Sequence, residues 1–443
     1  MASTYLTRTS SSAGTNTKGT FSAWVKRSSI SNVYPRIIQI RPSSGNGLDM
    51  YFRNTDILEI KLSSGGSVLA QLSTNRLFRD VNAWYHILLS IDTTSGTADD
   101  RVRLYVNGVK ETSFSTRTNP SQNADVKING SSDTIQIGLE VGGSSNIFSG
   151  SMSHIHWLDG TAHDASYFGS TDSTTGEWKI NTSPSVTYGT NGFFILKDGN
   201  SVTDQSGNSN NFTVGGGTLT KTEDCPSNVF ATLNPLVRHT GTVANGNTRY
   251  GTSSSSWIGI PATLGNLTGK WYWEYKLTTG AEWSQCGIVS QAGYNGILTS
   301  YVGGITNGVA MNTGGGDIYT AGGSAQAWFG SARSVGQIIS VALDCDNNKI
   351  YWGTNGVWGN SSNPATGSNG YSIPSALNTD KPYFPAFSVH NCTIDINFGN
   401  GTFGTTGITT NSGNGYAGTD GKSIFNYQPP TGYSALNTKG LNL

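Results

Sequence analysis

One stretch of the sequence constrains the fold more than any other, because apolar and polar residues alternate along it with a period of two. The alternating runs 335–344 and 349–354 lie on either side of the polar turn 346–348, and the second run leads directly into Asn355-Gly356. A period of two places successive side chains on opposite faces of a strand. Asn-Gly tolerates the positive φ angles of tight hairpin turns. The stretch therefore predicts a β-hairpin.

The composition extends this prediction to the whole chain. Glycine contributes 58 of the 443 residues, and only 12% of the residues are charged. Glycine, together with abundant serine, threonine and asparagine, suits the turns between many short strands. No sustained helical period occurs. We therefore expect an all-β chain that is long enough for two or three domains with separate cores.

The charge balance excludes several classes of partner. Lysine plus arginine and aspartate plus glutamate number 27 each, so no net field attracts nucleic acid or an anionic membrane. No segment approaches the ~18 apolar residues of a membrane span, and the N-terminus has no apolar signal-peptide core. We expect synthesis and folding in a cytoplasm. A weakly charged surface rich in hydroxyls and amides suits neutral glycans, and equally suits packing among copies of the same protein.

The cysteines point away from a metal centre. Cys225, Cys286, Cys345 and Cys392 are far apart in the sequence and form no C-x-x-C pair, whereas zinc needs clustered ligands. Cys286 and Cys345 lie in apolar strand patterns, which predicts small buried thiols.

The first part of the chain carries four separated strand motifs in a fixed order. They are the strand around Trp24, the strand after Trp84, a hairpin at 101–111 and a strand at 148–160. The series resembles laminin-G or concanavalin-A-like jelly rolls over about residues 1–170. The resemblance implies an antiparallel β-sandwich.

A short apolar strand at 193–196 and the loop 204–212 follow. The loop resembles the one that normally comes after the opening strand of a laminin-G-like domain, but here it comes last. We expect the strand and loop to close the sandwich from its C-terminal end, so that the first domain spans 1–220. A stable truncation lacking 186–215 would contradict this hypothesis.

The second part of the chain adds four further strand motifs to the hairpin. They lie at 269–277, 286–290, 383–389 and 393–399. The set resembles SPRY domains, which are β-sandwiches that bind partners and carry out no chemistry. The resemblance implies a second sandwich at 241–405, joined to the first by a linker at 221–240.

The remaining residues 406–443 contain no apolar pattern able to form a core of their own. Pro429-Pro430 prevents a helix or a central strand, so we expect an extended tail that clamps a neighbouring domain or subunit. The two domains and this tail together resemble virion proteins of tailed bacteriophages, especially marine ones. That resemblance implies a tail fibre, head fibre or other surface appendage with a role in host adhesion.

Catalysis is not expected. Jelly rolls include glycoside hydrolases, which need two carboxylates about 5–9.5 Å apart in a groove. No glutamate of this chain has a second carboxylate two or four residues away on the same strand face. The glutamates are Glu59, Glu111, Glu140, Glu177, Glu223, Glu274 and Glu282. Glu274 lies at a strand position where we expect a structural hydrogen bond.

Metal binding has two candidate positions, each with a favoured structural alternative. His154 and His156 are two apart in a predicted strand and could join Asp159 around a metal, but packed or hydrogen-bonded histidines are the preferred interpretation. Asp99 and Asp100 precede a strand at a place where some laminin-G-like loops bind Ca²⁺. A polar loop without a cation is the preferred interpretation there.

Aromatic residues outside the predicted strand cores are the candidate ligand-binding residues. In the second domain they lie in glycine- and serine-rich loops: Trp283, Tyr294, Tyr301, Trp328 and Trp358. Flat aromatic faces flanked by amides stack on sugar rings, and they also anchor protein interfaces.

The sequence thus predicts two antiparallel β-sandwiches in series with an extended tail, forming a non-enzymatic appendage on a virion surface. Its expected partners are other virion proteins, copies of itself in a symmetric homo-oligomer, and host cell-surface glycan. The first alternative is a decoration protein of the capsid or tail with a purely structural role. The second is a polysaccharide depolymerase, which would need paired carboxylates in a groove.

Overall fold

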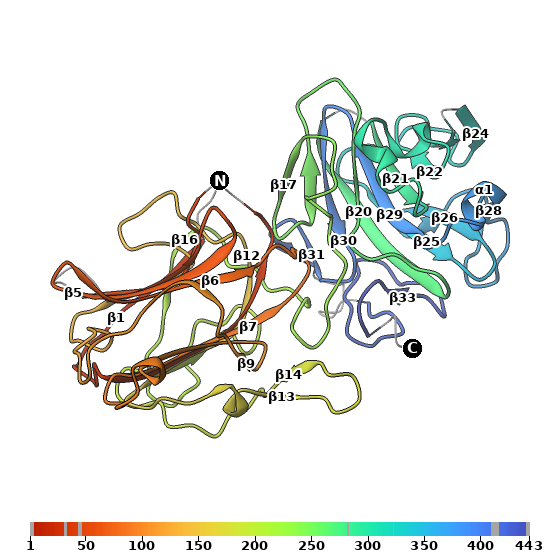
Figure 1. Cartoon of the computed structure of the whole chain (residues 1–443). Coiled ribbons are helices and arrows are strands. Elements are labelled where there is room, and N and C mark those ends of the chain that lie inside the picture. The colour runs from red at the N-terminus through yellow and green to blue at the C-terminus, as the bar shows by residue number, and fades with distance from the viewer. Residues whose placement is uncertain are drawn as a thin grey trace. The chain divides into compact units, whose positions relative to one another are not determined.

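The computed structural model confirms the all-β prediction, because strand makes up 43% of the chain and helix 4%. It describes residues 4–30, 33–42, 47–280, 283–321, 323–408 and 416–439. The chain divides into two compact units, Met1–Leu219 and Thr220–Leu443. In Figure 1 the first unit runs from red to yellow-green and the second from green to blue. No helix among the described residues has the length and apolar character needed to cross a bilayer.

Two antiparallel sheets form the first unit. The eight-stranded sheet has the order β10 (Phe114–Thr118), β6 (Ser67–Leu77), β5 (Ile57–Ser64), β4 (Leu48–Phe52), β3 (Arg36–Arg41), β11 (Thr134–Ile137), β1 (Tyr5–Thr9) and β16 (Thr213–Gly216). The six-stranded sheet has the order β15 (Phe193–Ile195), β12 (Gly150–Asp159), β2 (Lys18–Arg27), β7 (Tyr85–Asp92), β8 (Val102–Val106) and β9 (Val109–Lys110). A small ribbon and two short 3₁₀ turns lie outside them: β13 (Gly169–Thr171), β14 (Trp178–Ile180), η1 (Ala98–Asp100) and η2 (Ala165–Tyr167).

The core of the first unit lies between these two sheets. Ile38, Met50 and Ile60 from the large sheet are fully buried and join a cluster with Phe21 and Ile87 from the small sheet. Removing such side chains from water supplies the main stabilisation, at roughly 25 cal/mol per Å² of apolar surface. Alternation then places the neighbouring polar residues of the same strands on the outer face of the large sheet.

Both sheets of the first unit receive a strand from the C-terminal part of that unit. β15 pairs with β12, and β16 pairs with β1. The loop between them is fixed by Asp204, whose carboxylate accepts the backbone N–H of Phe194 at 2.8 Å. Phe212 from the same loop is 3% exposed and lies in the core. Residues 186–215 are therefore an integral part of this sandwich.

Two further sheets form the second unit. The nine-stranded sheet contains β17 (Thr242–Ala244), β18 (Arg249–Gly251), β30 (Cys392–Asn397), β20 (Lys270–Gly280), β25 (Ile338–Asp344), β26 (Lys349–Thr354) and β27 (Val357–Trp358), with β28 (Tyr371–Ser372) beside β26 and β33 (Ser434–Ala435) beside β20. The six-stranded sheet has the order β19 (Ile258–Pro261), β29 (Phe384–Val389), β21 (Ser284–Val289), β22 (Gly308–Asn312), β23 (Asp317–Thr320) and β24 (Gly323–Ala327). Short elements connect them: β31 (Thr402–Phe403), β32 (Thr406–Gly407), α1 (Ser375–Asn378), η3 (Gly296–Leu298) and η4 (Val302–Gly304).

The hairpin that constrained the sequence analysis is present. β25 and β26 pair antiparallel, with Ile339 opposite Thr354. Asn355 and Gly356 adopt φ angles of +48° and +82°, the left-handed conformation for which Asn-Gly is suited. Both strands contribute to a core that also contains residues of the six-stranded sheet, such as Phe387. The second unit is therefore also a β-sandwich.

Two segments outside the predicted sandwich 241–405 contribute residues to the core of the second unit. In the predicted linker 221–240, Phe230 and Leu233 are fully buried in the core of the second unit. In the predicted tail 406–443, Phe425 and Leu436 are also fully buried in that core. Isolated apolar residues without periodicity gave no sequence signal, yet each fills a place in the sandwich. The tail residues 409–415 and 440–443 lie outside the described residues.

A buried carboxylate holds the described part of the tail. Glu274 on β20 is completely buried, and its two carboxylate oxygens accept the backbone N–H groups of Asn426 and Tyr427, each at 2.8 Å. β33 then pairs in parallel with β20, with Trp271 opposite Ser434. The structural hydrogen bond expected for Glu274 is thus present.

Candidate functional site

Four aromatic rings gather at one end of the second unit, and we call them the aromatic cluster: Trp257, Trp283, Tyr301 and His390. The Trp257 ring lies 6.4 Å from Trp283, 5.3 Å from Tyr301 and 5.5 Å from His390, measured between centroids. Trp283 remains 47% exposed, and the other three rings are half-buried. A partly exposed set of flat rings is a surface on which a ligand can stack.

The ends of several strands position this cluster. Trp257 precedes β19, Trp283 precedes β21, and His390 follows β29, which pairs with both. The backbone N–H of His390 donates to the carbonyl of Trp283 at 3.0 Å. The Asn391 N–H donates to the carbonyl of Ser254 at 2.9 Å. The sheet register and these two bonds fix the loops that carry the rings.

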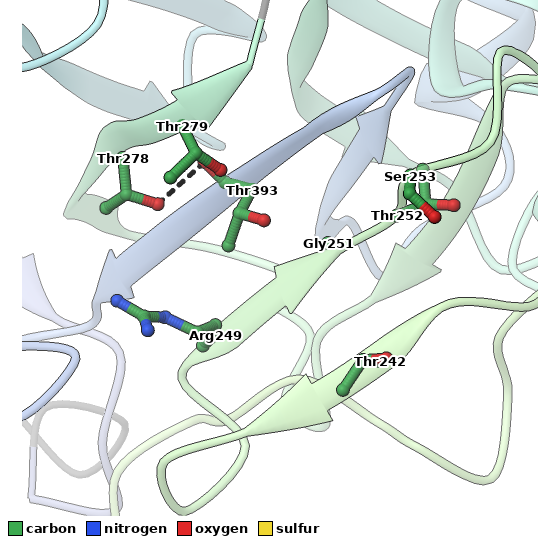
Figure 2. Close-up of a pocket in the computed structure, with 8 residues that line it drawn as sticks. All are labelled: Thr242, Arg249, Gly251, Thr252, Ser253, Thr278, Thr279 and Thr393. Carbon is green, nitrogen blue, oxygen red and sulfur yellow. Dashed lines mark hydrogen bonds between the residues drawn. The ribbon is translucent and has the colours of Figure 1, made fainter. Parts of the chain in front are cut away.

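A hydroxyl-lined groove of about 330 Å³ lies beside loop 252–257, which contributes Thr252 and Ser253 to its lining (Figure 2). It crosses β17, β18, β30 and β20, and its lining is Thr242, Arg249, Gly251, Thr252, Ser253, Thr278, Thr279 and Thr393. Arg249 is paired with Asp395 through two 2.6 Å contacts, which neutralise its charge. We call this feature the hydroxyl groove. Loop 252–257 joins it to the aromatic cluster.

The structure brings together two of the five predicted aromatic residues, Trp283 and Tyr301. Tyr294 lies elsewhere: its hydroxyl donates to the carbonyl of Ala262 at 2.9 Å and its ring packs on Phe384. Tyr294 is half-buried, and these contacts make it a packing residue apart from the aromatic cluster.

Trp328 and Trp358 also differ from the expectation. Trp328 is 4% exposed, and its indole N–H donates to the carbonyl of Trp352 at 2.8 Å. The prediction that Trp328 is a loop residue open to a ligand is therefore wrong. Trp358 is half-buried on β27 and lies edge-on to Tyr272. Glycine-rich flanks predicted open loops at both positions, but the chain folds these two rings inward.

Sequence reasoning missed two members of the aromatic cluster, Trp257 and His390. Trp257 directly follows the four consecutive serines 253–256. It therefore lies in a serine-rich stretch of the kind that marked the other aromatic candidates. His390 follows the apolar strand 384–389 directly and carried no such signal. Only the pairing of β29 with β19 and β21 brings His390 to the two tryptophans.

The first unit has a second polar site on the outer face of its large sheet. A groove of about 290 Å³ is lined by Tyr34, Arg36, Tyr51, Arg53, Glu59, Lys61 and Gln71. We call it the polar groove. Strand register explains it, because Tyr51 lies opposite Glu59, and Lys61 lies opposite both Asp49 and Gln71. The sequence signal was the polar half of each alternating strand.

Glu59 forms the floor of the polar groove and is 1% exposed. Five groups contact its two oxygens: Tyr51, Lys61, Ser73, Gln71 and Arg53. Burial opposes ionisation of this carboxyl, but the hydrogen bonds from Tyr51, Lys61 and Ser73 outweigh it and keep its pKa below the ordinary value. Glu59 is therefore an ionised anchor that fixes the side chains around it.

Glu59 and Glu274, the two most deeply buried of the three buried glutamates among the described residues, are not arranged as hydrolytic residues. A nucleophile or general acid must reach the substrate, whereas the oxygens of Glu59 and Glu274 are occupied by protein donors. Asp49, next to the polar groove, is paired with Arg36 at 2.8 Å, and burial raises its pKa to about 6. Glu282 lies outside the described residues.

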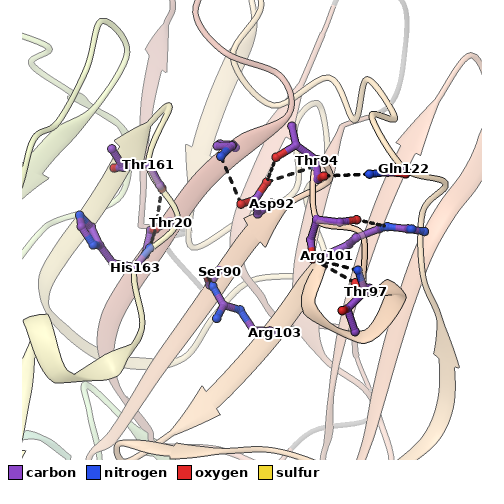
Figure 3. A network of polar contacts seen from close by, with 12 residues as sticks. Thr20, Ser90, Asp92, Thr94, Thr97, Arg101, Arg103, Gln122, Thr161 and His163 are labelled. Carbon is purple, nitrogen blue, oxygen red and sulfur yellow. Dashed lines mark hydrogen bonds and ion pairs between the residues drawn. The ribbon is translucent and has the colours of Figure 1, made fainter.

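The Ca²⁺ candidates Asp99 and Asp100 do not fit a cation. Asp99 is paired with Arg117 at 3.1 Å and Asp100 with Lys110 at 3.0 Å, so each already has a positive partner. Arg101, shown beside Thr97 in Figure 3, takes up the carbonyl oxygens of this loop. Its guanidinium donates to the carbonyls of Ser95, Gly96 and Pro120. These carbonyl oxygens, a ligand type that Ca²⁺ uses, therefore already accept hydrogen bonds from a guanidinium.

The histidine pair is likewise structural. The register of β12 shifts between Ser153 and His156, and His154 has φ +48°, so a bulge interrupts the regular alternation. His156 stacks on Phe194 at 3.9 Å. Asp159 accepts the backbone N–H groups of Thr15 and Asn191. Within the described residues, no three His, Cys, Asp or Glu side chains group in a way that could hold a metal.

Comparison with known proteins bears first on the N-terminal unit. Residues 1–166 match a family described as the concanavalin A-like lectin/glucanases superfamily. The match agrees with the laminin-G/concanavalin-A-like prediction for these residues and is compatible with carbohydrate binding. The superfamily includes glucanases as well as non-catalytic binding domains.

Among solved structures, the chain is similar to the SPRY domain of human HERC1, with 14% identity and a TM-score of 0.29 over 37% of this chain and 96% of that domain. It is also similar to a human SPRY domain, with 16% identity and a TM-score of 0.26 over 34% of this chain and 90% of that one. No curated protein matches the chain.

Proposed function

We propose that this protein is a non-catalytic glycan-binding adhesin, and that the aromatic cluster of the second unit is its sugar platform. The observation that carries the proposal is the gathering of Trp257, Trp283, Tyr301 and His390 from separate loops into one partly exposed set of rings. The family match of the first unit is compatible with carbohydrate binding and supports it.

The surroundings of the cluster favour a neutral sugar. Loop 252–257 and the segment 299–304 contain hydroxyl, glycine and apolar residues and no charged residue. In the adjoining hydroxyl groove the one cation, Arg249, is neutralised by Asp395. Sugar C–H groups pack on aromatic faces while sugar hydroxyls exchange hydrogen bonds with threonine and serine. A neutral oligosaccharide therefore matches both parts of this surface.

The site of action that we propose is the surface of a tailed-phage particle, as part of a tail or head fibre. The support is the sequence resemblance to phage virion proteins together with a surface built for recognition. Immunogold electron microscopy of the particles tests this. Label at fibre tips supports an adhesin, and label spread over the capsid supports the decoration alternative. Unlabelled particles would contradict the virion assignment.

Sugar binding is tested with the full chain on an array of neutral and acidic oligosaccharides, followed by titration of the strongest neutral binder. Trp283→Ala should weaken that binding at least tenfold, because one exposed stacking face is lost. Tyr301→Ala should weaken it less, since that ring is half-buried. Intrinsic tryptophan fluorescence should change on binding in the wild type.

Tyr416→Ala is the matched control, because Tyr416 is 41% exposed in the same unit and is not part of the aromatic cluster. The affinity of this variant for the neutral oligosaccharide should equal that of the wild type. Equal loss in Trp283→Ala and Tyr416→Ala would contradict a specific platform. Release of shortened oligosaccharide during prolonged incubation would contradict the non-catalytic assignment.

A further inference from the structure

We propose that the polar groove of the first unit is a second carbohydrate site, and that it takes an acidic sugar through the sugar carboxylate. This site is separate from the aromatic cluster, and its residues belong to a different unit. The polar groups of the groove differ in how many of their hydrogen-bond donors the protein already uses.

Arg36 is largely occupied, because each of its three guanidinium nitrogens already contacts an oxygen atom of the protein. It pairs with Asp49 at 2.8 Å and Glu140 at 3.2 Å, and it donates to the carbonyl of Tyr34 at 2.8 Å. Its guanidinium also lies 4.1 Å from the centre of the Tyr51 ring. Arg36 therefore supports the wall of the groove and fixes Tyr51.

Arg53 and Lys61 are different, because each forms one ion pair, with Glu59, and has a partly exposed side chain. The side chains of Arg53 and Lys61 are 40% and 33% exposed, and they contact Glu59 at 3.2 and 2.9 Å. A guanidinium has five N–H donors and an ammonium three. The carboxylate between them is 1% exposed. The groove thus has two partly exposed cationic side chains, while the Glu59 carboxylate between them is covered.

The ligand chemistry follows from this arrangement. Two cations held on one anchor can share the two oxygens of a carboxylate, and charge-assisted hydrogen bonds are the strong ones. Tyr34 is 36% exposed at the rim, edge-on to Tyr51 with 6.0 Å between ring centres. Its ring offers a stacking face for the sugar that bears the carboxylate. A uronic acid residue in a polysaccharide has both features.

The experiment uses the full chain with two probe polymers, polygalacturonate and alginate, and with carboxyl-reduced preparations of both. The expected result is binding to at least one polyuronate and at least tenfold weaker binding to its reduced form. Arg53→Gln and Tyr34→Ala should each weaken polyuronate binding severalfold. Both positions are partly exposed, so neither change removes a core group.

Lys110→Gln is the matched control, because Lys110 is an exposed cation of the same unit that pairs with Asp100 away from the groove. It should leave polyuronate binding unchanged. Three results would overturn the proposal: no polyuronate binding, equal binding of the reduced polymers, or equal losses in Arg53→Gln and Lys110→Gln. Dextran sulfate bound as tightly as polyuronate would also overturn it, because that would be non-specific attraction of a polyanion.

The proposals for the two sites can be tested independently of each other. Trp283→Ala should keep polyuronate binding, and Arg53→Gln should keep binding of the neutral oligosaccharide. A wild-type protein that binds polyuronate but no neutral oligosaccharide would contradict the aromatic cluster as an adhesin platform and leave the polar groove intact. A wild-type protein that binds the neutral oligosaccharide but no polyuronate would contradict the polar groove as a site and leave the aromatic cluster intact.

Discussion

The two units each bury a glutamate, and the pKa values of the two carboxyl groups move in opposite directions. In the first unit, burial opposes ionisation of Glu59, yet hydrogen bonds from Tyr51, Lys61 and Ser73 hold its pKa below the ordinary range. In the second unit, burial raises the pKa of Glu274 to about 7, although it too accepts several hydrogen bonds.

The difference lies in the charge of the groups that donate hydrogen bonds to each carboxylate. Glu59 is contacted by an ammonium and a guanidinium, whereas the donors to Glu274 are neutral: the Tyr272 hydroxyl, the Asn397 amide and the backbone N–H groups of Asn426 and Tyr427. Neutral donors stabilise a buried anion less than cations do. The first unit therefore uses a buried charge to order a surface, and the second uses a buried carboxyl to hold a segment of chain.

The largest expected effect is a loss of stability of the first unit in acid, because this unit also buries a neutral histidine. His86 is fully buried between the Ser22 hydroxyl and the Trp178 indole N–H, and burial lowers its pKa from 6.5 to about 3. Its contribution to stability is present above about pH 6.5 and is lost as the pH falls. Between pH 7 and pH 4 the loss is about 3 kcal/mol. Hydrogen exchange in peptides from β2 and β7 of the full chain measures it.

His86→Gln removes this titration while keeping a polar side chain at the position. The variant should be less stable than the wild type at pH 7, and its stability should vary less between pH 7 and pH 4. Identical pH profiles for the two proteins would show that His86 does not carry the acid sensitivity of the first unit.

Glu274→Ala should give the next largest effect. It leaves the N–H groups of Asn426 and Tyr427 without their acceptor inside the core, at a cost of about 3 kcal/mol. Glu274→Gln keeps an acceptor and should cost about 1 kcal/mol.

The cysteines all lie in the second unit, and Cys286, Cys345 and Cys392 are buried. Thiol labelling in increasing urea therefore reports this unit.

Cys225 is half-exposed and serves as the internal reference for labelling. Proteolysis between 416 and 439 should become faster in Glu274→Ala than in Glu274→Gln. Unchanged proteolysis together with a normal urea profile would contradict the role of Glu274 in holding the tail.

The pH dependence of the second unit should have the sign opposite to that of the first. The folded pKa of Glu274, about 7, lies above the ordinary 4.5, so its contribution is fully present below pH 4.5 and is lost as the pH rises through 7. From pH 5 to pH 8 the second unit should lose about 2 kcal/mol. Thiol labelling normalised to a small-molecule thiol measures this. Glu274→Gln should abolish the slope, and a slope of equal size in that variant would exclude Glu274 as its source.

The sequence was sufficient for the strand content and for the two sandwiches, because alternation and Asn-Gly turns are local signals. It was insufficient for residues such as Phe230 and Phe425, which enter the core singly and without period. Neither residue differs in sequence from an apolar residue in a loop. Burial of this kind depends on the shape of the finished sandwich.

The candidate sites also contain residues that the local sequence indicates and residues that only strand pairing brings together. Trp283 was identifiable from its loop, whereas His390 joins it only through the pairing of β29 with its neighbours. The polar groove depends on the register between neighbouring strands, which places Tyr51 opposite Glu59. A search for carboxylates within one strand could not find it. Cross-strand neighbours carry the chemistry of a sheet face.

The smallest expected effect belongs to Glu59→Gln, and it decides whether charge or shape organises the first unit's surface. The amide fits the same space but leaves Arg53 and Lys61 facing a neutral group, and its N–H₂ meets the Ser73 hydroxyl that donated to the carboxylate. We expect a loss of about 1–2 kcal/mol at pH 7, since the two cations are partly solvated. Because the Glu59 pKa is lowered, its contribution is present above the ordinary pKa and is lost as the pH falls. The difference between wild type and variant, measured by hydrogen exchange in β4 and β5, should therefore shrink in acid. A difference that stays constant with pH would mean that the carboxylate acts through its shape alone, and the contrast with Glu274 would then have another origin.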